Sequence, residues 1–253
     1  MTARFTTFLQ SFGAVARLSW STLFAFWRLP IEVRPLIHQF DTAGLQSWSI
    51  TVLTAAFTGM VLALQFSTGL EPYGASMYTG KLAALGIVRE LGPMLTALLV
   101  GGRVGSGFAA ELGSMVVTEQ VDAIRALGAD PIKKLVAPRV FACIVMLPLL
   151  TILADFVGFT GAMIITVREV GITPSFFYAQ ILDTLWVSDL MHGLMKSVAF
   201  GYIIGIVGCF IGLNTTGGTE GVGHATTQAV VVGAICLLVS NFFLTKLFLA
   251  LYG

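Results

Sequence analysis

The sequence predicts an all-α integral membrane protein with five transmembrane helices, and two observations carry that prediction. Of its 253 residues, 56% are hydrophobic and only 11% are charged, whereas soluble domains carry about 25% charged residues. Five apolar runs are each long enough to supply the ~20 residues that a helix needs to cross a bilayer. The net charge of +1 leaves no basic footprint, so nucleic acid is not an expected partner.

An amphipathic segment precedes the first crossing and is typical of a helix that lies in the membrane interface. Its apolar residues recur at helical spacing, and Pro30 ends the pattern. Ile31–Phe40 resembles a second, shorter surface elbow. We therefore assign residues 1–44 to interfacial and elbow helices and residues 45–253 to the five-span part of one domain covering 1–253. The apolar stripe consists of Phe5, Phe8, Leu9, Phe12, Val15, Trp20, Leu23 and Trp27.

The crossings follow in order, separated by short polar turns. Lys and Arg are concentrated before the first crossing and between the second and third. The positive-inside rule then places the N-terminus and the Glu111–Arg139 interval in the cytoplasm. The predicted crossings are about Gln46–Leu70, Lys81–Gly107, Val140–Val167, Leu190–Leu213 and Ala225–Tyr252.

The Glu111–Arg139 interval is polar and contains a short helix with both ends marked. Thr118 is the expected N-cap, Gly128 supplies a left-handed position after the last turn, and Pro131 prevents the helix from resuming. The helix is amphipathic. Its apolar stripe consists of Val117, Val121, Ile124 and Leu127, and its charged faces carry Glu119, Asp122 and Arg125.

The local sequence supports two interpretations of this helix equally well. An amphipathic helix between two membrane spans fits a groove on a partner protein. It equally fits a surface helix that rests on lipid headgroups.

Charged residues inside the crossings are the sharper functional signal, because such groups are costly in a membrane and are usually paired or functional. Arg89 and Glu90 project about 100° apart on a helix, and Lys196 is a candidate partner for Glu90. One reading is a structural ion pair between the second and fourth crossings. The other is a polar rim on a cavity that receives a charged headgroup. Asp155 fits either a core acid or a functional one, and Arg103 is expected to extend to the cytoplasmic face.

No catalytic or metal site is expected, so the chain is predicted not to be an enzyme and to hold no cofactor. Its three histidines are scattered, and the glycine-rich Gly101–Gly107 lacks the Gly-Lys-Ser/Thr ending that grips nucleotide phosphates. If the protein uses ATP, another subunit must bind and hydrolyse it. A glycine stripe in the fourth crossing predicts close helix packing; it consists of Gly201, Gly205, Gly208 and Gly212.

Short motifs along nearly the whole chain beyond the N-terminal helix resemble the MlaE-type permeases, the membrane subunits of ABC systems that move phospholipids or related lipids. One position, Asn241, departs from the family pattern, which has Asp there. The matching motifs are Arg89-Glu90-Leu91-Gly92-Pro93, Gly102-Arg103-Val104-Gly105-Ser106, Ala110-Glu111-Leu112-Gly113, Thr118-Glu119-Gln120, Ala126-Leu127-Gly128, Asp130-Pro131, Ala137-Pro138-Arg139, Leu147-Pro148-Leu149, Ala225-Thr226-Thr227 and Phe243-Leu244-Thr245.

The resemblance implies a homodimer in a bacterial inner membrane, with cytoplasmic ABC ATPase subunits docked on the Thr118–Leu127 helix. It also implies an MCE-domain protein on the non-cytoplasmic side and, in some systems, a STAS-domain subunit. By position it assigns the ATPase coupling to Glu119, Asp122 and Arg125. The implied lipid-binding residues are Leu62, Leu70, Tyr73, Arg89 and Glu90.

The expected function is therefore that of a permease subunit moving lipid between the inner membrane and the outer envelope, with the energy supplied by a separate ATPase. Two alternatives belong to other classes. A secondary transporter would use Arg89, Glu90 and Asp155 as an ion or proton relay, and would be expected to show inverted repeats. A membrane scaffold would use the short helix to recruit a cytoplasmic protein.

Overall fold

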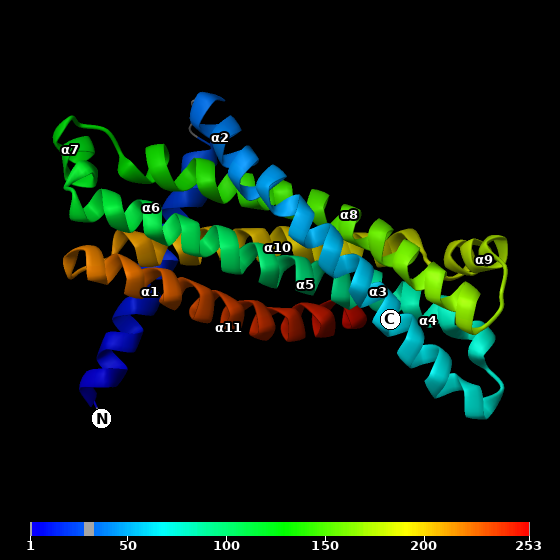
Figure 1. Cartoon of the computed structure of the whole chain (residues 1–253). Coiled ribbons are helices and arrows are strands. Elements are labelled where there is room, and N and C mark those ends of the chain that lie inside the picture. The colour runs from blue at the N-terminus through cyan, green and yellow to red at the C-terminus, as the bar shows by residue number, and fades with distance from the viewer. Residues whose placement is uncertain (1, 28–32, 253) are drawn as a thin grey trace. The chain divides into compact units, whose positions relative to one another are not determined.

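The structure is a computed structural model that describes the backbone of residues 2–27 and 33–252 and the side chains of residues 13–25 and 35–251. Every regular element in these ranges is helical, which confirms the predicted all-α class (Figure 1). The α-helices are α1 (Thr2–Trp27), α2 (Val33–Ala43), α3 (Trp48–Leu70), α4 (Thr79–Gly86), α5 (Gly92–Val100), α6 (Ser106–Val117), α7 (Gln120–Ala126), α8 (Ala137–Glu169), α9 (Pro174–Thr184), α10 (Val187–Leu213) and α11 (Gly218–Tyr252). Three 3-10 turns are η1 (Leu45–Ser47), η2 (Glu71–Tyr73) and η3 (Ser76–Tyr78), and three π-helical stretches are η4 (Ile87–Leu91), η5 (Gly101–Gly105) and η6 (Ile132–Val136).

Five stretches of the described residues are long and apolar enough to cross a membrane, as predicted. Each contains one of the predicted crossings or most of it. The second is longer than predicted, because α4, α5 and α6 are joined through η4 and η5 into one continuous helix. The five stretches are Pro35–Tyr73, Ser76–Val117, Ile132–Glu169, Val187–Leu213 and Gly218–Leu251.

Only part of the predicted N-terminal segment lies within the residues that the structure describes. Pro30, the expected end of the first helix, and the start of the elbow segment lie outside the described residues, as do the side chains of residues 1–12. Helix α1 reaches Trp27, and α2 follows from Val33. On the described part of α1, Trp20 and Leu23 are exposed. The interfacial position of this helix stays a prediction.

The chain forms two compact units, and α8, α10 and α11 contribute residues to both. The first unit comprises residues 1–45, 100–146 and 201–237. Its packing depends on the predicted glycine stripe of α10. A methyl group added at Gly208 would lie 2.8 Å from the carbonyl oxygen of Gly105, and one added at Gly205 would lie 2.9 Å from the Cα of Val140. These glycines therefore let α10 approach the backbones of its neighbours, as predicted.

The second unit comprises residues 46–99, 147–200 and 238–253. Here α3 meets α8 through small residues, because a Cβ at Gly59 or Gly161 would collide with a carbonyl group of the facing helix. A buried apolar cluster connects these helices to α4 and to α9. It consists of Ala63, Ala83, Ala84, Ile87, Ala162, Phe177 and Ile181.

Helix α9 lies between the third and fourth spans and was not predicted. Thr173 caps it by accepting a hydrogen bond from the Phe176 N–H at 3.3 Å, and Pro174 occupies its first turn. Gln180 donates to the carbonyl of Met77, and Asp183 forms an ion pair of 2.7 Å with Lys81. These contacts attach α9 to the start of the second span.

Helix α7 confirms the predicted short helix but corrects its start. Figure 1 shows it at the turn between α6 and the stretch that leads into α8. Thr118 ends α6 by donating its hydroxyl to the Ser114 carbonyl at 2.8 Å, and it does not cap α7. Glu119 takes the N-cap position with φ +58°, in the left-handed region. Gly128, with φ +75°, occupies the left-handed position after the helix, as predicted.

Candidate functional site: a polar cluster inside the spans

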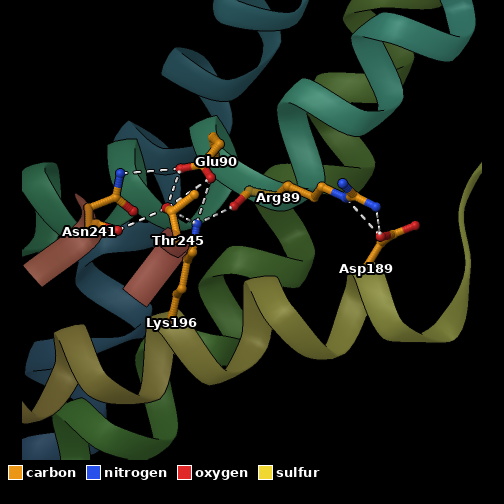
Figure 2. Close-up of polar contacts among 6 residues, drawn as sticks. All are labelled: Arg89, Glu90, Asp189, Lys196, Asn241 and Thr245. Atoms are coloured by element: carbon orange, nitrogen blue, oxygen red, sulfur yellow. Dashed lines mark hydrogen bonds and ion pairs between the residues drawn. The ribbon is translucent and has the colours of Figure 1, made fainter. Parts of the chain in front are cut away.

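Six polar side chains from three helical stretches of the second unit meet inside the membrane-spanning segments (Figure 2). We call them the polar cluster. Two come from η4, two from α10 and two from α11. Its members are Arg89, Glu90, Asp189, Lys196, Asn241 and Thr245.

The local sequence explains why the second span is irregular at this point. Ile87–Leu91 forms a π-helical turn, in which the N–H of Gly92 bonds to the carbonyl of Ile87. Pro93 follows and has no N–H to offer to the carbonyl of Arg89, four residues earlier. Lys196 donates to that carbonyl at 2.8 Å. π-Helical turns are frequent at functional sites, and this one carries both charged residues of the second span.

Lys196 is the centre of the cluster. Its ammonium group donates to Glu90 Oε1 at 2.7 Å and to the Thr245 hydroxyl at 2.8 Å, in addition to the Arg89 carbonyl. These three bonds use all three donors of the ammonium group. The predicted pair between Glu90 and Lys196 is therefore confirmed, and it joins the second span to the fourth.

The remaining oxygen of Glu90 faces α11. Asn241 donates its amide to Glu90 Oε2 at 3.2 Å, and the Thr245 hydroxyl lies 3.0 Å from Oε1. An amide at position 241 can donate to the carboxylate, whereas an ionised Asp there would repel it. The amide of Asn241 therefore stabilises the Glu90 carboxylate by a hydrogen bond in this chain.

Arg89 pairs separately with Asp189, a partner that sequence reasoning missed. Its guanidinium group lies 2.5 Å from Asp189 Oδ1 through Nη2 and 2.7 Å through Nε. The other oxygen of Asp189 accepts the N–H of Trp186 at 2.9 Å, at the start of α10. A signal existed in the sequence, because Asp189 and Lys196 are seven residues apart and so share one face of a helix.

The two ends of each ion pair differ sharply in burial. The side chains of Asp189 and Lys196 are 1% and 3% exposed, whereas those of Arg89 and Glu90 are 42% and 38% exposed. The desolvated charges are thus fully committed to their partners. Arg89 and Glu90 keep an open side that can meet another charged group.

The predicted lipid-binding residues do not form one compact site. Leu62 packs near Gly86, one turn before Arg89. Leu70 and Tyr73 lie at the far end of α3 and in η2, and the side chain of Tyr73 is 82% exposed. Arg89 lies about 20 Å along the second span from that end, at 1.5 Å per residue. The five residues therefore lie at different positions along the length of the spans in the second unit.

Asp155 of α8 is buried and does not belong to the polar cluster. Its Oδ1 has no hydrogen-bond partner among the described residues. It lies against Gly92, where an added Cβ would collide with this oxygen. Its burial fits a core acid, but no described residue satisfies this buried oxygen by a hydrogen bond.

The predicted coupling residues lie together on the exposed side of α7, in the first unit. Asp122 and Arg125 form an ion pair of 2.8 Å, with 70% and 62% of their side chains exposed, and Glu119 is also exposed. Val121 is buried and anchors the helix. The predicted apolar stripe ends early, because the side chain of Leu127, after the helix, is 85% exposed.

Comparison with known proteins gives consistent matches. The family model described as Permease MlaE matches residues 36–247. A protein of Synechocystis sp. named "Probable ABC transporter permease protein" is 45% identical over 217 residues, which cover 86% of this chain and 82% of the relative. One with the same description from Rickettsia felis is 38% identical over 241 residues, covering 95% and 93%. The Arabidopsis thaliana protein "TRIGALACTOSYLDIACYLGLYCEROL 1, chloroplastic" is 38% identical over 218 residues, covering 86% of this chain and 62% of that protein.

Proposed function

Because this chain belongs to the MlaE permease family, as a membrane-spanning permease subunit of an ABC transporter, we propose that its cargo is a lipid. The cargo would be a phospholipid or a related lipid, carried between the inner membrane and the outer envelope. A separate ATPase subunit supplies the energy. The name of the Arabidopsis relative is that of a galactolipid, which supports a lipid cargo. The relatives are named as ABC permeases, which favours this reading over a secondary transporter or a scaffold.

The observation that carries the proposal is the unequal burial of the polar cluster. Arg89 and Glu90 are each open on one side, while their partners are sealed within the spans. An open guanidinium group binds a phosphate with two parallel hydrogen bonds. An open carboxylate binds an ammonium group. A headgroup that carries either group can therefore dock here, while its acyl chains follow the apolar surfaces of the spans.

The coupling site of the proposal is α7. A helix of seven residues held by Val121 presents Glu119, Asp122 and Arg125 to the outside. Such a short, charged and exposed helix fits a groove on the ATPase subunit. Closure of the ATPase pair would push on these side chains and tilt the spans on either side of α7. Packed helices transmit such a push because their contacts have discrete arrangements.

The assembly that we propose is a homodimer with α7 and the N-terminus on the cytoplasmic face of a bacterial inner membrane. An MCE-domain protein would cover the opposite side and accept or supply the lipid. A STAS-domain subunit would bind the ATPase in some assemblies. ATP would be held by the ATPase subunit, and this chain would bind no cofactor of its own.

The test is ATP-dependent transfer of a fluorescent phospholipid by the assembly reconstituted in proteoliposomes. Arg89→Lys keeps the charge beside Asp189 but loses the planar fork, so transfer should fall about tenfold, as expected for one lost charge-assisted contact. Lys81→Arg is the matched control, because it makes the reverse exchange in an ion pair outside the polar cluster. Unchanged transfer by Arg89→Lys, or a purified assembly that retains no lipid by mass spectrometry, would contradict the proposal.

A further inference from the structure

The first unit contains a pocket that is separate from the polar cluster and shares Arg125 with the coupling face of α7. It lies between α1, the connection from α7 to η6, and the end of α10, and has a volume of about 400 Å³. Small-molecule sites typically span roughly 300–1,000 Å³. We call it the α1 pocket. Its polar lining includes Arg17, Ser21, Arg125 and Asp130, and its apolar lining includes Leu18 and Phe210.

The position of the pocket along the spans corresponds to the headgroup layer of a membrane. Ile132, at the start of the third span, and Leu213, at the end of the fourth, both line it. Transmembrane helices end where the hydrocarbon core gives way to headgroups. Helix α1 packs against η6 at this level, and Trp20 and Phe24 are exposed on α1. An exposed Trp is typical of the membrane interface, where its amphipathic ring lies at the level of the headgroups.

The chemistry of the pocket is that of a phosphate site. Arg17 forms no ion pair with any described residue, so its five N–H donors are available. Arg125 gives one nitrogen to Asp122 at 2.8 Å, and its remaining donors are available to a ligand. The planar guanidinium group matches the geometry of a phosphate and donates two parallel hydrogen bonds to its oxygens. The hydroxyl of Ser21, one helical turn after Arg17, adds a further donor.

The other residues that line the pocket favour a lipid over a soluble anion as the ligand. Leu18 and Phe210 supply apolar surface beside the arginines, which a free phosphate would leave unused. Asp130 is the acidic residue of the lining, and its Oδ1 already accepts the N–H of Ile132 at 2.9 Å. Its other oxygen can accept from an ammonium group of a headgroup.

We propose that the α1 pocket binds the phosphate of a phospholipid headgroup through Arg17 and Arg125, and holds a lipid that stays with the subunit and is not transported. The site lies in the first unit, whereas the polar cluster lies in the second. The proposal therefore does not depend on which cargo the subunit carries. The resident lipid would fix α1 beside η6 and the connection to α7.

The experiment compares lipid retained by the full-length protein, purified with its partners and transferred to lipid-depleted detergent. Native mass spectrometry measures binding of added phosphatidylethanolamine. Arg17→Gln should weaken binding about tenfold, the effect of one lost charge-assisted contact. Ser21→Trp should weaken it as well, because it fills the pocket while keeping both arginines. Lys133→Gln is the control, since Lys133 is an exposed cation next to Ile132 that does not line the pocket.

The outcomes separate the alternatives. Loss of binding in both pocket variants with normal binding in Lys133→Gln supports the site. Equal loss in Arg17→Gln and Lys133→Gln would show a diffuse basic surface and overturn it, as would normal binding in Arg17→Gln. Glycerol 3-phosphate added alone tests the source of the phosphate. If it binds as tightly as the lipid, the ligand is a soluble phosphate ester and the assignment to a headgroup is wrong. Circular dichroism of each variant verifies that the helices remain folded.

Discussion

The polar cluster and the exposed face of α7 contain the same kind of contact in opposite surroundings. Lys196 and Glu90 lie 2.7 Å apart, and Arg125 and Asp122 lie 2.8 Å apart. The side chain of Lys196 is 3% exposed, whereas both side chains of the α7 pair are more than 60% exposed. Nearly equal distances therefore correspond to very different energies. The buried cation has exchanged all its water for protein partners, while the α7 pair is solvated and can exchange partners readily.

This contrast separates two roles for charge in one chain. In the polar cluster, loss of Glu90 or Arg89 leaves Lys196 or Asp189 behind as a desolvated charge, so the pairs constrain how the second, fourth and fifth spans pack. On α7, a lost partner is replaced by water at little cost, so the charges remain available to another protein. Four substitutions test whether the two groups of charges differ in this way.

The largest effect is expected from Lys196→Met, which removes the centre of the polar cluster. Glu90 and the Arg89 carbonyl would lose their common donor inside the spans. Breaking a buried pair costs about 3–5 kcal/mol, and we expect a value near 3 kcal/mol because Glu90 retains some contact with solvent. Denaturant unfolding of the protein in detergent, followed by circular dichroism, measures it. A loss below about 1 kcal/mol would mean that the cluster is no more costly to break than an exposed pair.

The double change Glu90→Leu with Lys196→Met sharpens the same point. Replacing both partners of a buried ion pair by apolar residues is often neutral or stabilising, so the double variant should recover at least half of the stability lost in Lys196→Met. Lipid transfer should stay impaired, because the open carboxylate is gone. A double variant as unstable as the single one would show that Lys196 acts through Thr245 and the Arg89 carbonyl alone.

Charge reversal on α7 should impair lipid transfer while leaving the stability of the protein nearly unchanged. Asp122→Lys removes an exposed pair worth about 0.2–1 kcal/mol, so the unfolding free energy should change by less than about 1 kcal/mol. ATP-driven lipid transfer should fall strongly, because the face offered to the ATPase has changed sign. Glu71→Lys, a reversal at an exposed acid in η2, is the control. Normal ATPase activity and transfer in Asp122→Lys would exclude α7 as the coupling element.

The smallest effect is expected at the exposed pair between α9 and α4. The hydrogen bond from Lys81, together with its charge, holds the pKa of Asp183 below its ordinary value. An acid with a depressed folded-state pKa stabilises the fold above its unfolded pKa of about 3.9, and this contribution is lost as the pH falls through the folded pKa. Wild type should therefore melt slightly above Asp183→Asn at pH 7, and the difference should shrink as the pH falls below about 3.9. A melting difference that does not shrink as the pH is lowered through this range would rule out the ion pair as its cause.

The sequence predicted the helices and turns, which depend on local pattern, more accurately than it predicted the contacts between them. Each of the five spans contains the predicted crossing or most of it, and the glycine stripe of α10 packs as expected. Gly128 has the predicted left-handed conformation. Thr118 failed as the N-cap of α7 because its hydroxyl bonds back to the carbonyl of Ser114 at the end of α6. Helix α9 was missed because it is short and is stabilised by contacts with α4 and η3, which lie about 100 residues away in the chain.

For the candidate site too, the sequence predicted the residues more accurately than their contacts. The presence of Arg89 and Glu90 inside a span was visible from the apolar residues on both sides, and Lys196 followed as the cation that could neutralise Glu90. The pairing of Arg89 with Asp189 and the contacts of Asn241 and Thr245 were not visible. They depend on the rotation of α10 and α11 about their axes. Small residues and the π-helical turn set this rotation jointly across several helices.

The amino-acid pattern is sufficient to establish that this protein is helical, that it crosses a membrane and that it must bury a few charges in the process. Those properties follow from composition and periodicity, which are local and survive any arrangement of the helices. Only the tertiary structure decided which charges meet. Glu90 and Lys196 are 106 residues apart in the chain, and Arg89 and Asp189 are 100 apart. Burial of Lys196 and Asp189 became favourable only when packing brought Glu90 and Arg89 to them, which no isolated helix can do.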